Sequence, residues 1–191
     1  LKGFSPSKKL RTHINGIDLV KDTVTDKWII LEDNLRVPSG ASYPLSIRDT
    51  YRKIYPEFFE KMKIKKINDY PQILQEAMDY VNCDGINVVL TPGRFNSAYY
   101  EHNYLAHQSG AYLVRNHELV VKDKKVFFKN YNGQLIKVGA IYRRLDDEFI
   151  DPKFFNPESL IGLPGLMDAY LAGNVAIMNA PGNGGADDKG I

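Results

Sequence analysis

The stretch Ile86-Asn-Val-Val-Leu-Thr-Pro-Gly-Arg94 decides the fold, because an apolar run ends there in a Pro-Gly turn. A helical pattern follows over about residues 97–109, Gly110 is placed to end it, and residues 111–114 form a second apolar run. Strand, helix and strand in this order predict a βαβ unit with parallel strands and a right-handed crossover. The chain is therefore predicted to be an α/β protein.

The turn after the first of these strands is a candidate ligand site. Ligands of βαβ units gather at the carboxyl ends of the strands, which is where Thr91-Pro-Gly-Arg94 lies. The start of the helix offers free N–H groups to an anion, and Arg94 offers a bidentate partner for a carboxylate or phosphate. A plain turn with a solvated Arg94 explains the same residues, so both interpretations stay open.

A second stretch, Trp28-Ile-Ile-Leu-Glu-Asp-Asn34, carries possible metal ligands. Side chains of a strand alternate between its faces, so Glu32 and Asn34 point the same way if the strand reaches that far. A carboxylate and an amide oxygen are hard ligands of the kind that Mg²⁺ takes when it also holds nucleotide phosphates. The alternative is a polar strand end that enters a turn.

The preceding strand strengthens the metal hypothesis. Residues 14–20 and 27–32 are predicted to form a hairpin with its loop centred near Val24. That register puts Asp18 opposite Ile30 and diagonal to Glu32, on one face of the pair. A one-residue slip would separate the two carboxylates.

Helices are predicted between the hairpin and the βαβ unit. Residues 46–62 have a helical pattern interrupted at Pro56, and residues 37–43 before them form a loop. Asp69 is a predicted N-cap for the next helix. The apolar face expected for that helix consists of Ile73, Leu74, Ala77, Met78 and Val81.

The second half of the chain is predicted to be mostly strands. Residues 116–129 resemble a hairpin that turns near residues 123–125, and Asn132-Gly133 marks another turn. Residues 138–142 are a predicted buried strand. A short helix over residues 164–171 and a strand over residues 174–178 complete the pattern.

Charged residues follow the strand of residues 138–142. Arg143 and Arg144 suit an anion site, with Asp146 and Asp147 as partners that orient them, although local salt bridges of little energy would explain them too. His102, one turn into the predicted helix, is better explained as a packed or hydrogen-bonded histidine than as a catalyst.

Composition excludes several classes. The formal net charge of +2 in 191 residues gives no case for nucleic-acid or membrane binding. Cys83 is the only cysteine, so an internal disulfide and a zinc–thiolate site are excluded, which fits a cytoplasmic location. The glycine-rich stretch of residues 179–185 lacks the P-loop spacing. Both ends look cut, so we expect a fragment of a longer protein.

Several motifs together resemble the circularly permuted ATP-grasp family, of the type related to glutathionylspermidine synthetase. They keep the family's order from about residue 14 to the last residue. They are residues 16–20, 31–36, 38–40, 42–43, 90–93, 96–99, 101–102, 141–144, 146–147 and 186–189.

The resemblance implies an ATP-dependent carboxylate–amine ligase that works through an acyl phosphate, with ATP and Mg²⁺ as cofactors. Its substrates would be a small-molecule or peptide acid and an amine. Metal ligands would be Asp18, Glu32 and Asn34, and Lys189 would lie on the nucleotide side. Residues at the reacting centre would be Arg36, Arg143 and Arg144. Residues that hold the substrates would be Ser39, Ser42, Tyr43, Thr91, Gly93, Arg94, Asn96 and Glu101.

The resemblance also implies a division of the chain. Residues 1–68 would be the metal-bearing part of the ATP-grasp domain, residues 69–180 a Rossmann-like substrate domain, and residues 181–191 a loop that returns to the first part. Most of the adenine pocket would lie outside this chain, so we expect the isolated segment to be inactive. Two alternatives remain: a catalytically silent ATP-grasp-like scaffold, and a nucleotide- or sugar-binding module built on the turn of residues 91–93.

Overall fold

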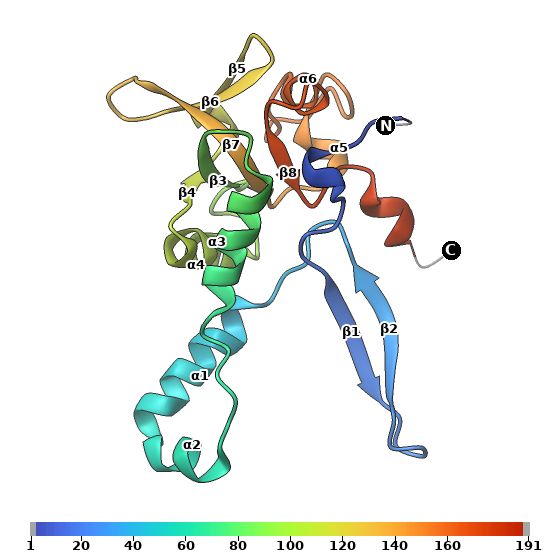
Figure 1. The fold of residues 1–191 in the computed structure, drawn as a ribbon, viewed down its shortest axis with the longest axis vertical. Helices are drawn as coiled ribbons and strands as arrows, with labels where there is room; N and C mark the ends of the chain where they lie inside the picture. Colours follow the sequence, from blue (N-terminus) through green and yellow to red (C-terminus); the bar gives the residue numbers. More distant parts are fainter. Residues whose placement is uncertain (1–2, 189–191) are drawn as a thin grey trace.

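The computed structural model describes residues 3–188, and its body is built on a mixed six-stranded sheet (Figure 1). The strand order is β4-β3-β7-β6-β5, and β8 also pairs with β7. The strands are β3 (Ile86–Leu90), β4 (Tyr112–Val114), β5 (Leu119–Lys122), β6 (Lys125–Lys129), β7 (Leu135–Arg143) and β8 (Ala176–Met178). Strands β3, β4, β7 and β8 are parallel to one another. Strand β6 pairs antiparallel with β7, and β5 pairs antiparallel with β6. The predicted βαβ unit is confirmed as β3–α4–β4.

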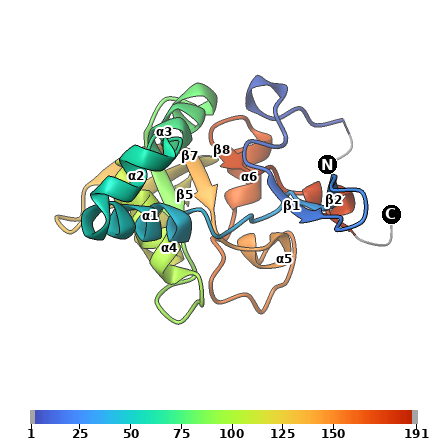
Figure 2. The same cartoon turned by 90° about the horizontal axis from the view of Figure 1, so that it is seen from below.

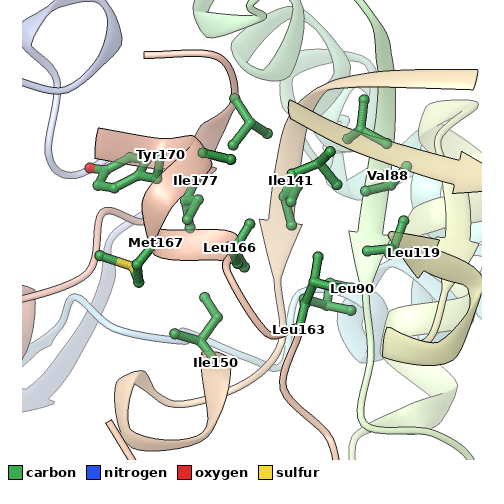
Figure 3. Packing of buried hydrophobic residues seen from close by; sticks show 14 of the residues in the cluster. Val88, Leu90, Leu119, Ile141, Ile150, Leu163, Leu166, Met167, Tyr170 and Ile177 are labelled. Atoms are coloured by element: carbon green, nitrogen blue, oxygen red, sulfur yellow. The ribbon is translucent and has the colours of Figure 1, made fainter. Parts of the chain in front are cut away.

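Helices cover both faces of this sheet. They are α3 (Tyr70–Val81), α4 (Tyr99–Ser109), α5 (Asp147–Ile150) and α6 (Leu166–Leu171). Alternate residues of β3 separate two cores, because Val89 packs with α3 and α4 while Val88 and Leu90 pack with α5 and α6. Figure 3 shows the second core, to which Leu166 and Met167 of α6 both contribute.

Two extensions project from the same side of the body (Figures 1 and 2). One is a hairpin of β1 (Gly16–Lys21) and β2 (Trp28–Asn34), and the other is a helical arm of α1 (Ser42–Ile54) and α2 (Pro56–Met62). Both views place the hairpin apart from the arm. Three short 3₁₀ turns also lie within residues 3–188: η1 (Ser7–Lys9), η2 (Asn116–Glu118) and η3 (Asn183–Ala186).

Three local predictions were wrong in whole or in part. Helix α1 begins at Ser42, four residues earlier than predicted, because its first N–H groups find an acceptor described below. Asp69 occupies the predicted N-cap position of α3, but its backbone is helical and its side chain makes no capping hydrogen bond. Ile73 is 52% exposed, so the buried stripe of α3 is narrower than predicted.

None of the helices within residues 3–188 has both the length and the apolar composition needed to cross a membrane.

Candidate functional site

The sheet reverses its winding between β3 and β7. After β3 the chain enters α4, on the face covered by α3, whereas after β7 it enters α5 and α6 on the other face. Such a reversal between adjacent parallel strands is where open α/β sheets bind ligands. We call the residues gathered there the switch-point site: Thr91, Glu101, His102, Arg144 and the loop of residues 38–42.

Glu101 is the centre of this site and is 1% exposed. Its Oε2 accepts hydrogen bonds from the backbone N–H groups of Gly40 (2.8 Å) and Ser42 (3.0 Å) and from Ser42 Oγ (3.1 Å). Its Oε1 accepts one from Ser39 Oγ at 2.9 Å. A carboxylate so well supplied with donors holds the loop and starts helix α1 at Ser42.

Arg144 supplies the positive partner of Glu101. Its Nη2 lies 3.3 Å from Glu101 Oε1, and both side chains are 1% exposed. Its Nη1 donates to the carbonyl of Pro38 at 2.7 Å and to Tyr142 Oη at 2.9 Å. Two charges taken out of water need such pairing, since an unpaired one would cost several kcal/mol. Arg144 therefore ties the loop to the end of β7, while its buried Nε has no hydrogen-bond partner among the described residues.

His102 lies beside this ion pair and binds Thr91. Its Nδ1 is 2.8 Å from Thr91 Oγ1, which also accepts the Gly93 N–H at 3.1 Å. Burial, helped by the nearby guanidinium of Arg144, lowers the pKa of His102 to about 4. The ring is therefore neutral near pH 7, in agreement with the prediction of a hydrogen-bonded histidine.

Arg143 points to the other face of β7 and is fully buried. Its Nη1 pairs with Asp147 Oδ1 at 2.5 Å and donates to the Leu145 carbonyl, and its Nε donates to the Asn179 carbonyl at 2.9 Å. Burial lowers the pKa of Arg143, although Asp147 opposes this shift. The Nη2 group is buried and has no hydrogen-bond partner among the described residues. The two neighbouring arginines thus serve different sides of the sheet.

The hairpin carries the predicted metal ligands on one face. Asp18 pairs directly with Glu32, and Gly16 pairs with Asn34, so the two carboxylates and the amide share that face. The predicted pairing of Asp18 with Ile30 was wrong. A one-residue shift after Asp18 leaves Leu31 as an extra residue in β2, and this bulge moves Glu32 opposite Asp18.

These three ligands differ in their surroundings. Asn34 Nδ2 donates to the Gly16 carbonyl at 3.1 Å, which turns its amide toward the hairpin base. Asp18 is exposed and Glu32 is half-buried. No group of three or more His, Cys, Asp or Glu residues within residues 3–188 is arranged to hold a metal ion; the set suggested here contains two such residues and an amide.

Three other predicted site residues contact neighbouring groups. Arg36 donates from Nε to Asp187 Oδ2 at 2.8 Å, a contact that raises its pKa. Asn96 Oδ1 accepts the Ala98 N–H at 2.9 Å. The Tyr43 ring centre lies 5.7 Å from that of Tyr100, with the two planes tilted by 30°. Lys189 lies outside the described residues.

A small cavity lies between the switch-point site and the hairpin, and residues of both line it. Its volume is about 160 Å³, and Glu101, Ser39, Pro38 and Gly16 are among the residues that line it. Since Gly16 pairs with Asn34, the cavity joins the base of the metal-ligand face to Glu101. The hairpin and the switch-point site are therefore parts of one region.

Asn179 is a structural residue that sequence analysis missed. Its Oδ1 accepts from the N–H groups of His13 (2.7 Å) and Ile14 (2.9 Å), and its Nδ2 donates to the carbonyls of Ile14 (2.6 Å) and Leu35 (2.9 Å). It thereby fixes both ends of the hairpin to the end of β8. The one available signal was an asparagine directly after a predicted strand, and that signal is weak.

Comparison with known proteins places the chain among the ATP-grasp proteins. All 191 residues match a family described as "A circularly permuted ATPgrasp". The chain belongs to the circularly permuted ATP-grasp family, as its motifs predicted, and membership of that family implies ATP as the nucleotide.

Several relatives are much longer. The "Uncharacterized protein sll0335" of Synechocystis is 47% identical over 99% of this chain and 40% of its own length, and "Uncharacterized protein Rv2411c" of Mycobacterium tuberculosis is 41% identical over 98% and 34%. A Frankia casuarinae protein named "Putative glutamate--cysteine ligase 2-2" is 35% identical over 94% of this chain and 21% of its own length. The chain thus spans less than half of each of these relatives.

Proposed function

We propose that this chain forms the metal-bearing and substrate-bearing part of an ATP-dependent carboxylate–amine ligase. In the proposed reaction the substrate carboxylate takes the γ-phosphoryl group of ATP and ADP leaves. An amine then attacks the acyl phosphate, forms an amide and releases phosphate. The family and the name of the Frankia relative support this class of reaction.

The observation that carries the proposal is the direct opposition of Asp18 and Glu32 across the hairpin. Like charges at opposed positions of a β pair repel each other, so this pair favours a cation between or beside them. Both carboxylates and the amide oxygen of Asn34 are oxygen donors, which fits Mg²⁺. A bound Mg²⁺ would offset charge on the nucleotide phosphates, and these three side chains would hold it.

The substrate residues are proposed from their place at the strand ends. Arg143 Nη2 and Arg144 Nε, on opposite faces of β7, are buried donors without a hydrogen-bond partner among the described residues. Either donor would reach a carboxylate or its phosphorylated form only after the groups that cover it move. Glu101 orients the loop of residues 38–42 beside Arg144. Arg36 lies beside the same loop and could approach the reacting group if it left Asp187.

The domain division is part of the proposal. Residues 69–180 contain the whole six-stranded sheet and would be the Rossmann-like substrate domain. Residues 1–68 would belong to the ATP-grasp domain, with residues 181–191 returning to it. Asn179, in the proposed substrate domain, makes hydrogen bonds to Ile14 and Leu35 in the proposed ATP-grasp part. These bonds hold the two parts together.

The test uses the full-length protein with Mg-ATP and a panel of amino acids, peptides and polyamines. We expect release of ADP that depends on an acceptor and is lost in Glu32→Ala. Asp33→Ala is the matched control, because Asp33 pairs with Ile17 and faces the opposite side of the hairpin. Equal ADP release by wild type and Glu32→Ala would overturn the metal assignment. Binding of ATP without ADP release for any acceptor would favour the catalytically silent scaffold.

A further inference from the structure

A second cavity lies at the carboxyl ends of β3 and β4, on the other side of β3 from the switch-point site. Its volume is about 270 Å³. Thr91 and Arg94 come from the turn after β3, Tyr99 begins α4, and Arg115 and Glu118 follow β4. Three of these five residues carry a full charge, so the cavity is suited to a charged ligand. Neither Arg115 nor Glu118 is distinctive in the sequence.

The two arginines can accept an anion. Arg94 makes no hydrogen bond or ion pair in the described part of the chain, and its guanidinium lies 5.1 Å from the Phe95 ring centre. Arg115 is half exposed, and its Nε is 3.6 Å from Glu118 Oε2. This single long contact leaves the two Nη groups of Arg115 for a carboxylate, which a guanidinium binds through two parallel hydrogen bonds.

Glu118 is held in place by the backbone of Arg115. Its Oε2 accepts the Arg115 N–H at 2.8 Å, and its own N–H donates to the Arg115 carbonyl at 3.0 Å. The turn between them is fixed by Asn116, whose Nδ2 donates to the carbonyls of Leu160 (2.9 Å) and Gly162 (3.1 Å). The described contacts use only one of the two carboxylate oxygens, so the other can accept a hydrogen bond from an ammonium group.

We infer that this cavity binds an acidic α-amino acid. Two guanidinium groups and one carboxylate give the lining a net charge of +1, which a ligand with two carboxylates and one ammonium balances. The carboxylates would pair with Arg94 and Arg115, and the ammonium with Glu118. The volume of about 270 Å³ is just below the usual range for ligand sites, about 300–1,000 Å³, which suits one amino acid and not a nucleotide.

The inference rests on the proposed function in one respect: the bound amino acid would be one of the two ligase substrates. Its binding can nevertheless be measured without ATP and without turnover. A carboxylate bound at the turn of residues 91–94 would lie beside Thr91, which lines the cavity. Thr91 also belongs to the switch-point site, where it is hydrogen-bonded to His102. The substrate would thus lie next to the proposed reacting centre.

Calorimetric titration of the full chain with L-glutamate, glutarate and L-glutamine tests the inference. Glutarate lacks the ammonium and L-glutamine lacks the second carboxylate. We expect each to bind at least about tenfold more weakly than L-glutamate, because each loses one charge-assisted hydrogen-bonded partner. Equal binding of the three compounds would overturn the assignment.

Variants identify the residues responsible. Arg115→Gln should weaken L-glutamate binding by about tenfold. Glu118→Gln keeps an acceptor for the Arg115 N–H and should remove the preference for L-glutamate over glutarate. Arg52→Gln is the control, since Arg52 is a guanidinium on the distant arm, 5.5 Å from the Phe59 ring centre. Circular dichroism checks that each variant folds.

The outcomes separate this inference from the proposed function. Unchanged affinity in folded Arg115→Gln and Glu118→Gln would overturn the inference, even if ADP release depends on Glu32. Glutamate binding that needs Arg115 and Glu118 would support it, even in a protein that releases no ADP.

Discussion

The β1–β2 hairpin and the switch-point site adjoin each other, yet they are stabilised in opposite ways. In the switch-point site Glu101 and Arg144 are almost completely buried and each makes several hydrogen bonds. In the hairpin Trp28 is 67% exposed, Ile30 61% and Leu31 66%, so neither face packs on a core within the described residues.

The difference shows how each region keeps its geometry. Buried charges hold the switch-point loop because breaking one pair would leave the other charge in a dry environment. A two-stranded hairpin is marginally stable by itself, so this one depends on its attachment to the body. Substitutions in the first region should therefore change folding, whereas substitutions on the hairpin face should change ligand binding.

The largest effect is expected from Glu101→Ala. The change leaves Arg144 buried without its charged partner and removes the acceptor for four donors of the loop, so we expect a loss of about 3–5 kcal/mol in the free energy of unfolding. Urea denaturation measures it. Glu101→Gln keeps one acceptor oxygen and should lose less. A loss under about 1 kcal/mol for the alanine variant would mean that burial does not set the role of Glu101.

Removal of Asn179 should detach the hairpin from the body. Asn179→Ala leaves backbone groups of residues 13, 14 and 35 without partners, which should cost about 2 kcal/mol. Hydrogen exchange should become faster in β1 and β2 and stay slow in β3 and β7. Asn132→Ala, in an exposed turn, is the control. Uniform acceleration over the whole chain would contradict a local role at this junction.

The pH dependence of stability should reveal His102. Its folded pKa of about 4 is below the ordinary value of 6.5, so the folded state disfavours the protonated ring. The associated stability is complete above pH 6.5 and decreases as the pH falls toward 4, by on the order of 2 kcal/mol. Denaturation of wild type and His102→Gln at several pH values measures the difference. Parallel curves between pH 6.5 and 4 would show that His102 is not the group that titrates.

The smallest effect on folding is expected from Glu32→Gln. Without Mg²⁺ the free energy of unfolding should change by less than about 0.5 kcal/mol. The variant loses the contacts of the Glu32 carboxylate, but it also loses the repulsion between that carboxylate and Asp18, and the two effects oppose each other. With Mg²⁺ the melting temperature of the wild type should rise and that of the variant should stay constant. Asp33→Gln, on the opposite face, should respond to Mg²⁺ as the wild type does. An identical response of Glu32→Gln would remove the hairpin from the metal hypothesis.

Local patterns in the sequence determined much of this protein. The apolar run before Thr91, the helical pattern after it and the stop at Gly110 predicted the βαβ unit, because strands and helices have different periods and glycine readily adopts the left-handed conformation at a helix end. The Asn132-Gly133 turn was predicted because glycine readily adopts the positive φ that such a turn needs. Alternation also placed Glu32 and Asn34 on one face.

Tertiary structure decided what each charged residue contacts. The bulge at Leu31 set the partner of Asp18, and no local pattern signals an extra residue in a strand. The ion pair of Glu101 with Arg144 joins residues 43 positions apart, and Asn179 reaches back 165 positions to Ile14. The charged cavity forms only because β3 and β4 end side by side, which brings Arg94 near Arg115. Contacts at such separations depend on how the elements pack, and a pattern read along the chain contains only the elements themselves.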